Sequence, residues 1–281
     1  MMKYAFINGN FIEETNASIS IFDRGFLFGD AIYEVLPVYN GRPFFLEKHL
    51  ERLFSNLDKI KIPIPSYPFE EIIDQLIRKN GGDTMQVYLQ ITRGNQGIRK
   101  HDIPDSLEPT VVAFTLHNKF PSLEDKEKGM SAKLIEDFRW SRCDIKTTSL
   151  LANIMINHEA VSAGYLTSIM VRDGYITEGS TCNVFIVDSN DLIVTPPLNN
   201  LCLPGITRNI VLELIQKSNL KYTEANITID DLYSAKEVWI TSTTKEIFPI
   251  VTVNDKPINK GIIGGTWRIL NNQFQQLLTK A

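Results

Sequence analysis

The 281-residue sequence predicts a mixed α/β (α+β) fold in two domains. Three observations support this prediction: short apolar stretches typical of strands, apolar residues at helical spacing between them, and one polar, charged stretch at 118–129. We expect a smaller N-terminal α/β domain over 1–118, an interdomain linker over 119–129 and a larger C-terminal domain over 130–281.

The N-terminal domain begins with the patterns of an antiparallel sheet. The expected strands are short apolar stretches next to turn residues: two within 4–14, then 31–39, 85–92 and 109–117. Leucines at helical spacing predict an amphipathic helix over 45–60, and a second helix is expected over 68–79. The leucines of the first helix are expected to pack on the sheet.

The C-terminal domain is expected to mix strands and helices as well. The expected strands are 130–136, 167–172, 175–177, 184–187 and 237–241. Helices are expected over 149–163 and 264–278, and another begins at Pro204-Gly205-Ile206-Thr207. The glycine motifs of nucleotide-binding loops are absent from the sequence.

Composition restricts the class of partner. Lysine and arginine total 29 against 33 acidic residues, so the chain has no basic footprint for nucleic acid, and small molecules are the expected ligands. Neither a secretion signal nor an 18-residue apolar run is present, which favours the cytoplasm and no membrane partner. The three cysteines have no C-x-x-C spacing, which predicts reduced thiols rather than disulfides or a zinc site. The four histidines also lack metal-ligand spacing, so no catalytic metal is expected.

Lys146 is the first candidate for catalysis, because it lies just ahead of an apolar helical stretch. A lysine held among apolar and cationic neighbours has a lowered pKa and can act as a nucleophile. Arg139, Trp140 and Arg142 are expected to provide that environment. A solvated loop lysine is the alternative, and the lysine by itself leaves both interpretations open.

Other candidates are polar residues at positions suited to anions or cations. Tyr33 offers a phenol on a strand, and Arg52 lies beside the leucine stripe, where its guanidinium can reach a phosphate. Arg99 and His101 occupy a loop suited to a carboxylate, and Glu178 precedes a strand, where it can pair with a cation. Each also has an ordinary structural interpretation.

Two further stretches suit a phosphate. The helix that starts near Ile206 and Thr207 offers unsatisfied N–H groups and a positive dipole end. Thr243 belongs to a cluster of hydroxyl residues, 241–244, that can face the same anion. A simple capped helix start is the alternative for the first stretch.

Most of the candidate residues lie in five motifs, which follow one another in the order D-R-G-F-L-F-G-D-A-I-Y-E, R-W-S-R-C-D-I-K, E-G-S-T-C-N-V-F, L-P-G-I-T-R and T-S-T-T-K-E-I. Together these motifs resemble the ordered motifs of the class IV (fold type IV) aminotransferases, which use pyridoxal 5'-phosphate. The resemblance covers nearly the whole chain, and R-W-S-R-C-D-I-K with R-K-H is most similar to the D-amino acid aminotransferases of the family. The stretch 94–99 is one residue longer than the family pattern.

The resemblance implies a barrel-like C-terminal domain that binds the cofactor, and roles for individual residues. Lys146 would form the Schiff base with pyridoxal 5'-phosphate and move the proton between the substrate α-carbon and the cofactor. Glu178 would keep the pyridine nitrogen protonated, and Leu203 would pack on the ring. The phosphate would be bound by Arg52, Ile206, Thr207 and Thr243.

The resemblance also implies a reaction and an assembly. Tyr33, Arg99 and His101 would bind the substrate carboxylate, the last two from the second subunit of a homodimer. The expected ping-pong reaction converts a D-amino acid such as D-alanine and 2-oxoglutarate into a keto acid and D-glutamate. The alternatives are a 4-amino-4-deoxychorismate lyase that releases pyruvate, a branched-chain L-amino acid aminotransferase, and a non-catalytic binding protein for a phosphorylated ligand.

Overall fold

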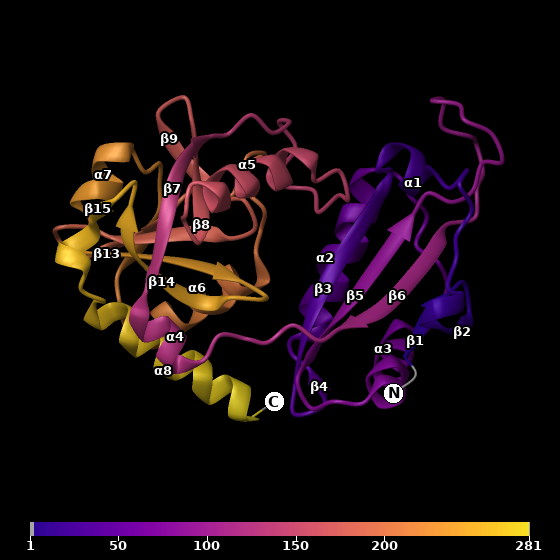
Figure 1. The fold of residues 1–281 in the computed structure, drawn as a ribbon, viewed down its shortest axis with the longest axis horizontal. Helices are drawn as coiled ribbons and strands as arrows, with labels where there is room; N and C mark the ends of the chain where they lie inside the picture. Colours follow the sequence, from indigo (N-terminus) through magenta and orange to yellow (C-terminus); the bar gives the residue numbers. More distant parts are fainter. Residues whose placement is uncertain (1–2, 281) are drawn as a thin grey trace. The chain divides into compact units, whose positions relative to one another are not determined.

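The computed structural model describes residues 3–280 and divides into two compact units, each described by itself below (Figure 1). The first unit comprises residues 3–119 and 145–149, and the second comprises 120–144 and 150–280. The expected domains gave 145–149 to the C-terminal part, whereas this segment belongs to the first unit because its backbone pairs with a strand there. Residues 1, 2 and 281 lie outside the described residues.

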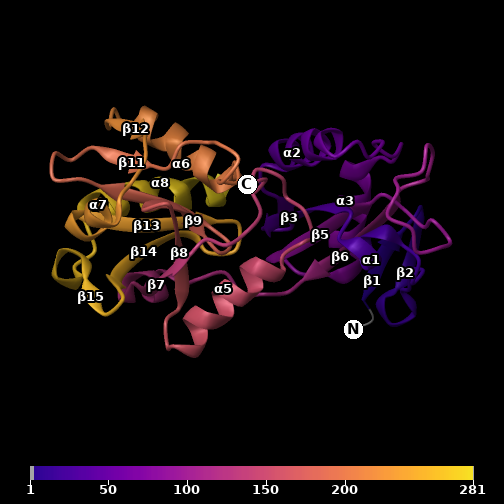
Figure 2. The same cartoon turned by 90° about the horizontal axis from the view of Figure 1, so that it is seen from above.

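The first unit is built on a six-stranded sheet in which every pair is antiparallel. Its order is β2-β1-β6-β5-β3-β4, and the strands are β1 Tyr4–Ile7, β2 Asn10–Glu13, β3 Ala31–Tyr39, β4 Arg42–Pro43, β5 Met85–Thr92 and β6 Thr110–Leu116. The helices α2 (Leu46–Lys59) and α3 (Phe69–Asn80) cover one face of this sheet (Figure 2). The short helices are η1 Glu14–Asn16 and α1 Arg24–Phe28.

The core of the first unit lies between the sheet and its two long helices. Alternate residues of β3 such as Ile32 and Leu36 are fully buried there, together with Leu53 and Leu57 of α2. Because successive strand residues point to opposite faces, the residues between them, including Tyr33, point to the other face. The two helices and the strands expected in this unit are observed.

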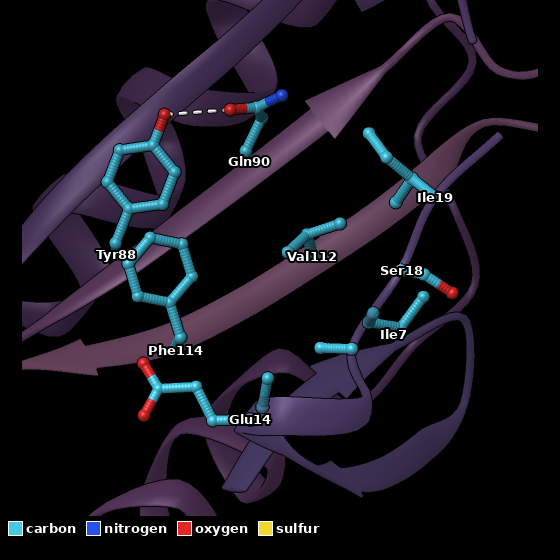
Figure 3. Close-up of a pocket in the computed structure, with 10 residues that line it drawn as sticks. Ile7, Glu14, Ser18, Ile19, Tyr88, Gln90, Val112 and Phe114 are labelled. Atoms are coloured by element: carbon cyan, nitrogen blue, oxygen red, sulfur yellow. Dashed lines mark hydrogen bonds between the residues drawn. The ribbon is translucent and has the colours of Figure 1, made fainter. Parts of the chain in front are cut away.

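The second face of the sheet has a hollow of about 310 Å³ (Figure 3). Tyr88 and Gln90 of β5 line it beside Val112 and Phe114 of β6, and the Tyr88 hydroxyl donates to Gln90 Oε1 at 2.7 Å. Tyr33 pairs with Gln90 in the strand register, so its side chain points to this face as well.

The second unit is built on a nine-stranded, strongly curved sheet. Its main path is β12-β11-β10-β13-β14-β7-β8-β9, with β15 paired to β14. The strands are β7 Met130–Glu136, β8 Thr167–Arg172, β9 Tyr175–Gly179, β10 Asn183–Val187, β11 Ile193–Thr195, β12 Tyr222–Glu224, β13 Glu237–Ser242, β14 Glu246–Val253 and β15 Lys256–Pro257. The last strand of the path, β9, turns directly into β10, where the Gly179 N–H donates to the Cys182 carbonyl, so the sheet bends into a half-barrel.

Helices complete the second unit: α4 Leu123–Lys128, α5 Leu151–Ser162, α6 Ile206–Lys217, α7 Ile229–Ser234, α8 Gly265–Lys280 and the short η2 Ile258–Gly261. The sequence did not predict α4, which lies in the expected linker and starts with a capping box between Ser122 and Asp125. It also did not predict β14, in which Pro249 interrupts the apolar pattern. No helix among residues 3–280 is long and apolar enough to cross a membrane.

Candidate active site

Lys146 is held by backbone contacts in the first unit. Its carbonyl accepts from the Tyr33 N–H at 3.1 Å, and its own N–H donates to Asn56 Oδ1 at 2.9 Å. The Asn56 amide in turn donates to the Arg52 carbonyl of α2 at 2.7 Å. The segment that contains Lys146 is thereby fixed between the start of β3 and α2, although it lies 90 residues from Asn56 in sequence and still farther from Tyr33.

The Lys146 side chain lies over the ring of Tyr33, with 4.4 Å from Nζ to the ring centroid. Tyr33 stacks on Tyr88, and their centroids are 5.5 Å apart. The structure therefore brings together the predicted nucleophile and one predicted substrate residue. An aromatic face attracts an ammonium group, so Tyr33 orients this amine at its open face.

Two of the three residues predicted to surround Lys146, Arg139 and Arg142, pair with carboxylates. Arg142 donates to Asp144 at 2.9 Å, and Trp140 is half exposed to solvent. Arg139 pairs with two carboxylates of the second unit. Within the first unit the contacts of Lys146 are the Asn56 amide and the Tyr33 ring, and the cationic environment expected from Arg139 and Arg142 stays a prediction.

Arg52, predicted to bind a phosphate, makes a two-pronged ion pair with Glu34. Its Nε and Nη2 donate to the two Glu34 oxygens at 2.7 and 2.8 Å, and His49 Nδ1 lies 2.8 Å from the same carboxylate. Burial acts to raise the Glu34 pKa, but the Arg52 guanidinium holds it far below its usual range. Glu34 was not among the site residues predicted from the sequence, although a carboxylate on the apolar face of a strand is a signal of such a pair.

Glu178 lies buried in the second unit and accepts three hydrogen bonds. The donors are Arg139 Nη1 at 2.5 Å, Asn183 Nδ2 at 3.1 Å and the Leu203 N–H at 3.1 Å. Burial raises the pKa of the Glu178 carboxyl, while the Arg139 guanidinium and the Leu203 N–H act in the opposite direction. A further positive donor would therefore stabilise the ionised form of this carboxylate.

Asp137 holds Arg139 in place from the other side. It accepts from Arg139 at 2.8 and 2.9 Å, from Arg172 at 3.0 Å and from the Thr177 hydroxyl at 2.8 Å. Burial raises the pKa of Asp137, but these partners, Arg139 above all, lower it overall. Asp137 was not predicted from the sequence either, because it follows β7 by one residue and its partners lie up to forty residues away.

The start of α6 is joined to Glu178 through Asn183. The Asn183 amide donates both to Glu178 and to the Leu203 carbonyl at 2.9 Å, and it lies so close to Gly205 that a Cβ there would be 2.0 Å from Asn183 Oδ1. Gly205 is the N-cap of α6, and no side chain caps that helix start. No side-chain cap therefore competes with an anion for its first N–H groups.

Ile206 and Thr207 begin α6 and are buried. The predicted hydroxyl cluster lies at the turn between β13 and β14: Thr241 pairs with Asn183 in the sheet register, and Thr243 follows in the turn. The buried Thr241 hydroxyl has no hydrogen-bond partner in the described part of the chain. An unpartnered buried hydroxyl costs about 1–3 kcal/mol, so it favours a ligand that accepts or donates there.

Arg99 and His101 lie in the exposed loop between β5 and β6 of the first unit. The Phe28 ring contacts both, with 5.4 Å from Arg99 Cζ to its centroid and 5.2 Å between the His101 and Phe28 centroids. The structure thus brings these two predicted substrate residues together on the Phe28 ring. Phe28 was not among the site residues predicted from the sequence.

Comparisons with known proteins identify the family of this chain. A family model described as amino-transferase class IV matches residues 31–253. D-alanine aminotransferase of Bacillus licheniformis is 40% identical over 94% of this chain and 92% of that protein, and D-alanine aminotransferase of Staphylococcus aureus (strain N315) is 35% identical over 99% and 98%.

A solved structure adds the fold. The branched-chain amino acid aminotransferase of Escherichia coli has a TM-score of 0.89 at 22% identity, and the match covers 99% of this chain and 95% of that one. At this identity the likeness concerns the fold, which confirms the predicted two-domain fold type IV architecture. The chain therefore belongs to the class IV aminotransferase family.

Proposed function

We propose that this enzyme transfers the amino group of a D-amino acid such as D-alanine to 2-oxoglutarate, which yields a keto acid and D-glutamate. The observation that supports this most is the 40% identity to a D-alanine aminotransferase over 94% of the chain. The alternating half-reactions require one amine-accepting group that both substrates visit in turn. The expected kinetics are therefore ping-pong.

The proposed cofactor is pyridoxal 5'-phosphate, and the donor set fits it. A buried carboxylate whose pKa is raised by burial suits a protonated ring nitrogen. An uncapped helix start and an unpartnered buried hydroxyl suit a phosphate. When bound, the cofactor supplies an electron-accepting ring that stabilises negative charge at the substrate α-carbon.

The proposed catalytic residues are Lys146 and Glu178, each acting on one stated proton. The Lys146 amine would move the proton from the substrate α-carbon to the cofactor, and back in the reverse half-reaction, which is general acid–base chemistry worth about 100- to 10,000-fold. The Glu178 carboxylate would hold the proton on the pyridine nitrogen, and the Arg139 guanidinium favours the ionised form of that carboxylate. The family membership supports the proposal that these two residues serve one cofactor.

The proposed phosphate ligands are the backbone of Ile206, the Thr207 and Thr243 side chains, and Arg52. The guanidinium of Arg52 is already bound to Glu34, so it would act as a fixed positive charge beside the anion. Leu203, whose N–H donates to Glu178, is the proposed contact for the ring face.

Substrate recognition is proposed to use Tyr33, Arg99 and His101 as donors to the α-carboxylate. Arg99 and His101 are proposed to act on the site of a second copy in a homodimer, as expected for this family. The substrates are then small amino and keto acids, and the carboxylate common to both explains how one site accepts each in turn.

The decisive experiment is a substrate panel on purified protein supplied with pyridoxal 5'-phosphate. D-alanine and 2-oxoglutarate should give pyruvate and D-glutamate, whereas L-leucine and 4-amino-4-deoxychorismate should react far more slowly. Pyruvate release from 4-amino-4-deoxychorismate alone would establish a lyase instead. Borohydride should fix the cofactor to the peptide that contains Lys146, and a protein that stays colourless with the cofactor would exclude the enzyme.

A further inference from the structure

Arg24 is a buried arginine whose guanidinium binds the backbone of the loop that contains Arg99 and His101. Its Nη1 donates to the Lys100 carbonyl at 2.8 Å and the Asp102 carbonyl at 3.3 Å, and its Nη2 donates to the His101 carbonyl at 3.2 Å. The same Nη1 donates to Gln96 Oε1 at 2.7 Å. One side chain, 4% exposed, thus contacts residue 96 and residues 100–102 of the loop.

Phe28 completes this arrangement from the same short helix. The Arg24 guanidinium carbon lies 4.9 Å from the centroid of the Phe28 ring, and the Arg99 guanidinium carbon lies 5.4 Å from it. His101 contacts the same ring. Helix α1 itself is fixed at both ends, because Asp23 caps its start and Gly29 ends it with a φ of 67°, which an L-residue rarely adopts.

Asp30 anchors Arg24 and a second buried arginine, Arg93. Arg24 Nε donates to Asp30 at 2.8 Å, and Arg93 donates to the same carboxylate at 2.7 and 3.0 Å. The other side-chain hydrogen bonds of Arg93 go to the carbonyls of Ile60 and Lys61, after α2. The two arginines therefore share their carboxylate but differ in the backbone that they hold.

We propose that Arg24 and Phe28 are positioning residues for substrate recognition. Arg24 fixes the loop backbone over 96–102, and Phe28 aligns the side chains of Arg99 and His101 as neighbouring donors for a substrate carboxylate. This inference deepens the proposed function and rests on it. Within the 94–99 stretch, the Arg24 guanidinium contacts the Gln96 side chain.

The test compares Arg24→Lys with Arg93→Lys in the holoenzyme. A lysine has a single nitrogen and cannot reach Asp30 and three loop carbonyls together, so the loop loses several charged hydrogen bonds while the buried charge remains. For Arg24→Lys we expect the KM for D-alanine and for 2-oxoglutarate to rise at least about tenfold, with kcat changed less than about threefold. For Arg93→Lys we expect a lower melting temperature and unchanged KM values.

Hydrogen exchange without substrate provides a readout that does not depend on activity. Amides of 97–103 should exchange faster in Arg24→Lys than in native protein and Arg93→Lys. Phe28→Leu, which keeps an apolar side chain, should raise KM without faster exchange. Equal KM values in Arg24→Lys and native enzyme, or the same KM rise in Arg93→Lys, would overturn the inference. A native protein that transaminates no D-amino acid would instead refute the proposed function, and the inference with it.

Discussion

Arg139 and Glu178 form a buried ion pair with 2.5 Å between Nη1 and Oε1, and their side chains are 5% and 6% exposed. The Arg139 guanidinium also forms an ion pair with Asp137, at 2.8 Å from Nη2 to Oδ2. Buried charges are costly without partners, so this set is stable only because each member has several charged hydrogen bonds. The carboxylate therefore has a fixed position and direction before any ligand binds.

Glu178→Gln should lower kcat for D-alanine by about 100- to 1,000-fold, because a neutral amide no longer stabilises a positive ring nitrogen. The absorption spectrum of the bound cofactor should shift as well. The matched control is Glu159→Gln, whose side chain is 54% exposed and pairs with Lys133. Native-like kcat and spectrum in Glu178→Gln would contradict the proposed role.

Lys146→Ala should reduce the half-reaction with D-alanine at least about 100-fold, because the proton at the α-carbon loses its acceptor. Single-turnover absorbance measurements detect this step directly. Borohydride treatment should then leave no cofactor on the 146 peptide. Lys133→Ala, on the surface of the second unit, should behave as native protein does.

His49 should make the folded protein less stable as the pH falls from 7 to 5. Burial lowers the pKa of His49, and the nearby charges of Arg52 and Lys146 add to this, although Glu34 opposes it. Below an unfolded-state pKa of about 6.5, the unfolded chain binds a proton that the folded chain does not, so stability decreases by at most about 1.4 kcal/mol per pH unit until the folded-state pKa is reached.

The check is a series of thermal melts between pH 5 and pH 7 for native protein, His49→Gln and the exposed His158→Gln. His49→Gln should flatten the pH dependence, since glutamine can still donate to Glu34 but does not titrate. The His158→Gln curve should run parallel to the native one. A slope unchanged by His49→Gln would exclude His49 as the source.

Lys126→Met should destabilise the second unit by about 3–5 kcal/mol, because it leaves the buried Glu246 without its cation. Lys126 Nζ lies 2.5 Å from Glu246 Oε2 and 3.1 Å from Asn271 Oδ1, and it is 1% exposed. Denaturant unfolding measures the loss. The double variant Lys126→Met/Glu246→Gln should recover part of it, whereas Lys128→Met, at an exposed pair with Glu124, should change stability by less than about 1 kcal/mol.

Local patterns predicted much of the fold. The alternation in 85–92 and the leucine spacing in 45–60 depend only on which face of an element is buried, and both elements are observed as β5 and α2. Elements without a strong period were not predicted, among them α4, whose polar surface resembles a linker and whose one buried lysine is paired 120 residues away.

The sequence by itself determined the order of the motifs around Lys146 and Glu178, and through it the family and the expected chemistry, because residue types and spacing are local properties. Only the tertiary structure decided which residues are partners. Arg52 pairs with Glu34, and Glu178 pairs with Arg139. Arg24 binds the loop of Arg99 and His101 through carbonyls that lie 76 to 78 residues after Arg24 in the sequence. Such pairs form when packing removes charged groups from water, and burial depends on how distant elements meet rather than on their sequence neighbours.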